Sequence, residues 1–192
     1  MGDLRAGRLM RNPFRREADG SLTWQAQAFE VGLLSSLAEQ VIALVDAPAW
    51  SDDPLQRWAN EQSASTLDRS DPVVARLFPE AYADPEQARE YRHLMEAEQR
   101  SSKAADARLV LDALAAADRE RPVVAIAASD VQAWVKTTNT VRLALGARLG
   151  IETEVDAEEV DQVHEDDPRR PVVDVYHWLQ LVQSALLDAL TG

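Results

Sequence analysis

Residues 138–151 read TNTVRLALGARLGI, and residues 174–179 read DVYHWL. In the first stretch apolar residues recur every three or four positions, as on one face of an α-helix, and Gly150 can adopt the left-handed turn that closes a helix. The second stretch lies inside a periodic segment with a wide apolar face. The sequence therefore predicts a helix over residues 129–150, begun by a capping box at Ser129 and Gln132, and a final helix over residues 172–190.

Upstream segments carry the same helical signals. Residues 26–45 place Phe29, Val41 and other apolar side chains on one stripe, which predicts a core helix. Asp-Pro steps, in which the carboxylate caps free amides and proline occupies the first helical position, predict a short helix at residues 71–78 and a long one at 84–117. The middle of the long helix, residues 96–103, is polar and is expected to be exposed.

Three short segments are typical of strands. Residues 14–17 and 21–25 flank Ala18, Asp19 and Gly20, a sequence suited to a hairpin turn, and residues 122–127 are apolar and β-branched. The predicted fold is mainly α, with a bundle of five to six helices and a small antiparallel sheet made of the N-terminal hairpin plus one strand.

The chain divides into two parts by composition. Residues 1–25 form a basic arm and hairpin packed on the body, and residues 26–192 form a single helical domain with a mobile polar insertion near 47–70. The candidate basic arm comprises Arg5, Arg8, Arg11, Arg15 and Arg16. Within the insertion, Trp50 and Trp58 are candidate docking residues, because indole is enriched in binding hot spots.

Composition restricts the function classes. The net charge of −13 repels phosphate backbones, so direct nucleic-acid binding is not expected. The chain has no cysteine, which excludes disulfides, thiolate metal sites and thiol catalysis by its own side chains. With neither a long apolar run nor the apolar core of a signal peptide, the protein is expected to be cytoplasmic and not membrane-bound.

No motif predicts a reaction or a cofactor. The chain lacks Gly-x-Gly-x-x-Gly, Walker and Gly-x-Ser-x-Gly patterns, and His93, His164 and His177 do not form the paired Glu-x-x-His motifs of a di-iron bundle. The acidic residues between 152 and 167 are typical of a solvated loop. We therefore expect no enzyme activity, no metal and no cofactor.

One polar cluster lies on the two C-terminal helices. It consists of Asn139, Arg142, Asp174, Tyr176 and His177. These side chains could line a pocket if the helices face each other. Alternatively they could form a buried network in which Arg142 pairs with Asp174 and fixes how the helices cross.

The sequence resembles an actinobacterial family of unknown function that includes the oxidative-stress transcriptional regulator AosR. The resemblance lies in residues 138–151, in residues 174–179 and in the segment DPVVARLFP at residues 71–79. The resemblance implies a non-enzymatic regulatory protein that acts through protein–protein contacts, in transcriptional regulation or the stress response. Its partner would be a transcription component. The first alternative is an adaptor linked to proteolysis or sulfur metabolism, which would bind a client protein. The second alternative is a small-molecule sensor or an enzyme with an unrecognised site.

Overall fold

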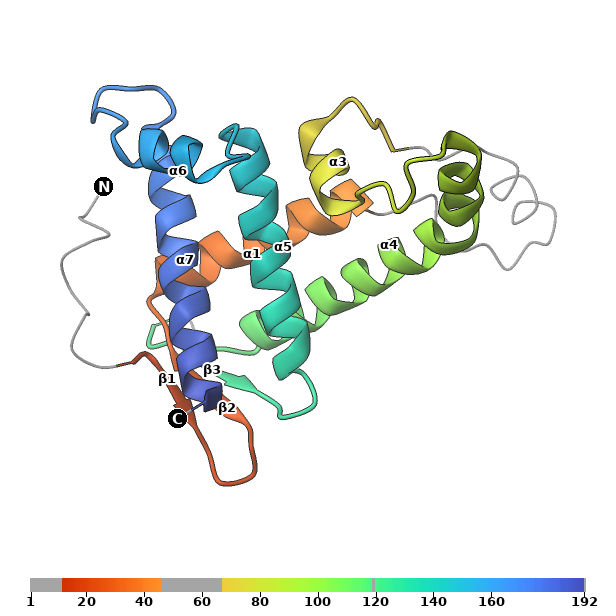
Figure 1. The fold of residues 1–192 in the computed structure, drawn as a ribbon. Helices are drawn as coiled ribbons and strands as arrows, with labels where there is room; N and C mark the ends of the chain where they lie inside the picture. The colour runs from red at the N-terminus through yellow and green to blue at the C-terminus, as the bar shows by residue number, and fades with distance from the viewer. Residues whose placement is uncertain (1–11, 46–66, 119, 192) are drawn as a thin grey trace.

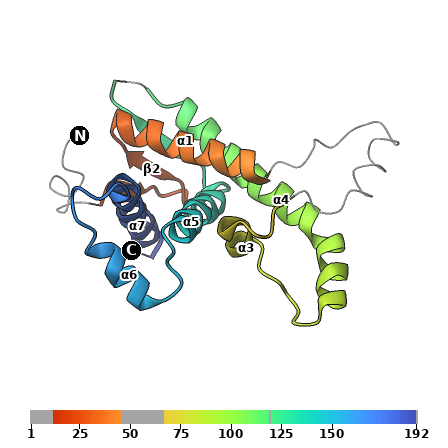
Figure 2. The same ribbon diagram turned by 90° about the horizontal axis from the view of Figure 1, so that it is seen from above.

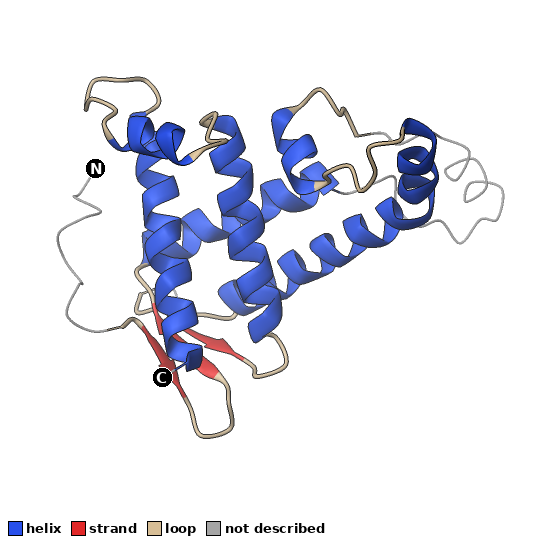
Figure 3. Ribbon diagram, viewed as in Figure 1, coloured by secondary structure: helices blue, strands red, loops and turns tan. Residues whose placement is uncertain are grey.

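The computed structural model describes residues 12–45, 67–118 and 120–191, and Trp50, Trp58, Arg5, Arg8 and Arg11 lie outside them. Within these residues the fold has six helices and a three-stranded antiparallel sheet, which confirms the predicted class (Figure 1; Figure 3). The helices are α1 (Ala28–Val45), α3 (Pro72–Leu77), α4 (Pro85–Ala115), α5 (Val131–Arg148), α6 (Glu154–Asp161) and α7 (Arg170–Thr191).

The sheet joins the N-terminal hairpin to a strand from the middle of the chain. Strands β1 (Phe14–Arg16) and β2 (Leu22–Gln25) pair antiparallel, and β3 (Val123–Ile126) pairs antiparallel with β2. Gly20 has a φ of 84°, a conformation that other residues rarely adopt, so the predicted turn is confirmed. Alternate side chains of β2 and β3 are buried, which gives the sheet one face toward the helices.

The helices form two crossing layers. Helices α5 and α7 stand side by side, α1 and α4 cross behind them, and the sheet lies against their lower ends (Figure 1; Figure 2). The main core lies between these layers and contains Trp24 from the sheet, Leu34 from α1 and Trp134 from α5. By length and composition α1 could span a membrane, but its Leu34 and Val41 pack within this core.

The buried face of α1 differs from the predicted stripe. Phe29 is 50% exposed, whereas Leu34, Leu37, Val41 and Val45 are buried. Positions four apart drift by about 40° around a helix, so Phe29 lies about 120° from Val41. A stripe extended at a constant spacing of four therefore winds away from the core.

One side of the polar middle of α4 is buried, which the sequence did not predict, whereas Glu98, Ser101 and Ser102 are exposed as expected. Glu96 and Arg100 are 8% and 7% exposed, because α4 crosses the C-terminal end of α1 there. The Nε of Arg100 donates to the carbonyl of Val45 at 2.8 Å, and a guanidinium nitrogen lies 3.8 Å from the Glu96 carboxylate. Glu96 also accepts a hydrogen bond from Arg69. This network, Arg69–Glu96–Arg100, satisfies a helix-end carbonyl that would otherwise lack a donor.

The two ends of α5 show one wrong and one correct prediction. Asp130 precedes the helix without a side-chain cap, and Ser129 Oγ donates to its carboxylate at 2.8 Å, so the predicted capping box is not formed. At the other end Gly150 has a φ of 74°, and the amide of Ile151 donates to the carbonyl of Gly146 at 2.9 Å. This closing pattern is a Schellman motif.

Gly150→Ala is expected to lower the free energy of unfolding by about 1 kcal/mol, because alanine is strained in the left-handed conformation. No atom lies within 4 Å of a Cβ added at Gly150, so backbone strain alone causes the loss. Gly32→Ala is the matched control, since Gly32 is exposed inside α1 and has equal space. Gly32→Ala should raise the free energy of unfolding by about 0.5–1 kcal/mol. Urea denaturation measures both, and equal effects would contradict the assignment.

Candidate functional site

The predicted polar cluster lies on α5 and α7, which are neighbours. The Oδ1 of Asn139 accepts hydrogen bonds from Arg142 at 3.0 Å and from Gln183 of α7 at 3.4 Å. The Nε of Arg142 is buried and has no hydrogen-bond partner among the described residues. Asn139 therefore joins the two helices through its amide oxygen.

The sequence suggested an ion pair between Asp174 and Arg142, and this pair is not formed. The Oδ1 of Asp174 accepts from the Nε of Arg170 at 2.9 Å, and Arg170 also donates to the carbonyl of Val163 at 2.8 Å. Arg170 lies one turn earlier on the same helix, within easy reach of Asp174. The Arg170–Asp174 pair thus fixes the loop after α6 to the start of α7.

The ring centres of Tyr176 and His177 lie 6.0 Å apart, but their other contacts differ. The Nε2 of His177 lies 2.6 Å from the Oδ1 of Asp161, the last residue of α6. Tyr176 is 7% exposed and lies beside Gly146 of α5. The five predicted residues therefore take part in four separate sets of contacts, and the structure does not bring them together in one described pocket.

The acidic stretch contains a helix where the sequence indicated a loop. Thr153 caps α6: its Oγ1 accepts from the amide of Asp156 at 3.3 Å, and the Asp156 carboxylate accepts from the amide of Thr153 at 2.7 Å. This reciprocal pair is a capping box, and its sequence signal, Thr-x-x-Asp, was overlooked. Most carboxylates of α6 remain solvated, so the expected exposure of the acidic residues is largely confirmed.

Asp156→Asn is expected to destabilise the protein near neutral pH. Hydrogen bonds from the amides of Glu152 and Thr153 hold the pKa of Asp156 below its usual 3.8. A lowered carboxyl pKa means that the stabilisation is present above about pH 4 and disappears as the pH falls through the folded-state value. When denaturation is measured at several pH values, the free energies of unfolding of the variant and the parent should become equal at acidic pH. Glu158→Gln, on the same helix and exposed, is the control, and a pH-independent loss at position 156 would contradict this role.

Of the two described arginines of the basic arm, Arg16 contacts the helical body and Arg15 pairs within the hairpin. Arg16 donates to the carbonyl of Leu190 at 2.9 Å, near the end of α7, and Arg15 pairs with Glu17 at 2.7 Å. Asn12, just before β1, donates to the carbonyl of Ala185 at 2.8 Å. These bonds attach β1 to α7, and they give Arg16 a structural contact.

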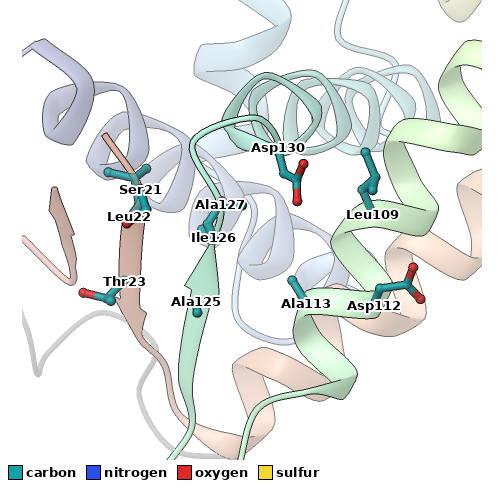
Figure 4. A pocket seen from close by; sticks show the side chains of 10 residues that line it. All are labelled: Ser21, Leu22, Thr23, Leu109, Asp112, Ala113, Ala125, Ile126, Ala127 and Asp130. Carbon is teal, nitrogen blue, oxygen red and sulfur yellow. The ribbon is translucent and has the colours of Figure 1, made fainter. Parts of the chain in front are cut away.

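Two of the cavities on the described surface are lined by α4. One, of about 360 Å³, lies between the sheet and the C-terminal half of α4, and its lining residues include Ala113, Ile126, Asp112 and Asp130. Figure 4 shows the Asp112 carboxylate pointing away from β3. The other, of about 400 Å³, lies between α1, α4 and α5 and has a polar lining that includes Lys103, Lys136 and Thr137.

Over residues 10–190 the chain matches a family described as a domain of unknown function, DUF2017. The chain belongs to this family. It is also similar to a Mycobacterium leprae protein provisionally named as the oxidative stress regulator AosR, with 27% identity over 177 residues, which cover 84% of this chain and 78% of that protein. No solved structure matches the chain. The family resemblance predicted from the C-terminal stretches is thus confirmed.

Sequence reasoning missed the polar cavity between α1, α4 and α5. Its residues come from helices that are distant in the chain, so no local motif connects them. One signal was present, because Lys103 and Lys136 are the only lysines of the chain and all its other cationic side chains, histidine aside, are arginines. Both lysines line this cavity.

Proposed function

We propose that this DUF2017 protein is a cytoplasmic regulatory protein that acts through protein–protein contacts in transcriptional regulation or the stress response. The observation that carries the proposal is the similarity to the protein named as an oxidative stress regulator, which extends over most of both chains. The proposal adds that the chain performs no reaction of its own and binds a transcription component.

The charge distribution supports a protein partner. The net charge of −13 opposes approach to a nucleic-acid backbone, whereas the solvated carboxylates of α6 suit a basic protein surface. Val155, 62% exposed on α6, adds apolar area within this acidic face. We define this face, α6 together with the loop to α7, as the acidic end.

The chain cannot respond to oxidation through a thiol, because it contains no cysteine. A thiol-based oxidative signal would therefore have to arrive through the partner. The proposal accordingly assigns this protein the role of a binding component, with any thiol chemistry on another polypeptide.

Deletion of the gene in the native cell tests the proposal, with transcripts and protein half-lives measured before and after peroxide treatment. A regulator of transcription should change a defined set of transcripts, and the parent gene should restore them. Changes in protein half-lives with unchanged transcripts would instead indicate the proteolysis adaptor. Unchanged transcripts under both conditions would contradict the proposal.

A further inference from the structure

Both lysines of the chain line the same cavity. Lys103 comes from α4 and Lys136 from α5, and Val41 of α1 also lines the space between them. A lysine carries a compact charge on a flexible stem, whereas arginine presents a fixed planar fork. The polar cavity is thus the one place in the sequence where lysine is used in preference to arginine.

Two carboxylates, Asp106 and Glu98, line the cavity together with the two lysines. Lys136 lies 3.7 Å from the carboxylate of Asp106, and Lys103 forms no ion pair among the described residues. Instead Lys103 lies over the ring of Phe78, 5.7 Å from its centre, and burial lowers its pKa. The two ammonium groups therefore share Asp106, while Glu98, the other carboxylate of the lining, is exposed and screened by water.

A buried hydroxyl in the same lining also lacks a partner. Thr137 is 2% exposed, and its Oγ1 makes no hydrogen bond within the described part of the chain. The adjacent Thr138 donates to the carbonyl of Trp134 at 2.8 Å, which is the usual solution for a helical threonine. Buried polar atoms are nearly always hydrogen-bonded, so the Thr137 hydroxyl can serve an acceptor from beyond the described residues once its side chain turns toward the cavity.

We propose that this cavity binds a small organic anion, whose phosphate or carboxylate oxygens accept hydrogen bonds from Lys103, Lys136 and Thr137. A volume of about 400 Å³ lies within the range of small-molecule sites. The anion would give the two ammonium groups a further acceptor beside Asp106, the carboxylate that they share. Because the cavity joins α1, α4 and α5, occupancy would also stabilise the packing of these helices.

NMR of the full chain labelled with ¹³C-lysine tests this proposal with two assignable side-chain signals. Inorganic phosphate and succinate are titrated separately at constant ionic strength, with chloride as the reference anion. At least one of the two probes should shift both lysine signals in a saturable manner, and the better probe identifies the phosphate or carboxylate class. No saturable shift with either probe would overturn the proposal.

Three variants separate a ligand site from a local salt effect. Lys136→Gln, at a side chain that is 56% exposed and therefore safe for folding, and Thr137→Val, which keeps the side-chain shape, should each weaken binding about tenfold or more. Arg121→Met removes one positive charge from an exposed residue outside the lining and should leave the affinity within about twofold. Equal loss in all three variants, or no loss in the first two, would contradict the site.

Discussion

Arg100→Met is expected to lower the free energy of unfolding by about 3–5 kcal/mol, one of the two largest losses expected for a single substitution in this protein. The arginine side chain is 8% exposed and donates to the carbonyl of Val45 at the end of α1. Its removal leaves the buried Glu96 carboxylate without one of its cations and the carbonyl without its donor. Urea denaturation followed by circular dichroism measures the loss.

Two further variants show whether burial causes that loss. Arg92 pairs with Glu80 near the surface, with side chains 29% and 47% exposed, and Arg92→Met should cost less than about 1 kcal/mol. The double substitution Glu96→Leu with Arg100→Met should recover part of the stability, because it removes both members of the buried pair. A similar loss for Arg92→Met and Arg100→Met would contradict the structural role of the Arg69–Glu96–Arg100 network.

Trp134→Ala is expected to destabilise the protein by a similar amount, about 3–5 kcal/mol. Trp134 is fully buried and lies edge-to-face with Trp24, with ring centres 5.9 Å apart. The substitution leaves a cavity where α5 packs on the sheet. Thermal and urea denaturation measure the loss.

Trp134→Phe distinguishes packing from hydrogen bonding at this position. The indole Nε1 of Trp134 is buried without a hydrogen-bond partner in the described residues. Phenylalanine removes this unsatisfied donor and keeps an aromatic ring, so the loss should be well below that of alanine. Equal losses for the two variants would show that the indole nitrogen makes a contact absent from this structure.

Features set by neighbouring residues were predictable from the sequence. Asp84 accepts from the amides of Glu86 and Gln87, and Pro85 begins α4, as the Asp-Pro step indicated. The same holds for the turn at Gly20 and for the end of α5 at Gly150. In each case a single residue determines the backbone conformation, so the local sequence is sufficient.

Features set by the way helices cross were not predictable. The spacing on α4 does not show that Arg100 will meet the carbonyl of Val45, because this contact spans 55 positions of the chain. Likewise, the sequence allowed Asp174 to pair with either Arg142 or Arg170. Arg170 is the partner because α7 packs against the loop after α6. The convergence of Lys103 and Lys136 is of the same kind.

Affinity capture of the tagged full chain from its native cell, followed by mass spectrometry, tests the proposed regulatory role most directly. Capture is repeated with Glu158→Lys plus Glu159→Lys at the acidic end, and with the matched pair Glu39→Lys plus Glu90→Lys on exposed positions of α1 and α4. The proposal predicts that a transcription protein is enriched over a tag-only control, and that only the charge reversal at the acidic end removes it. Capture of no transcription protein by the parent chain would contradict the proposal.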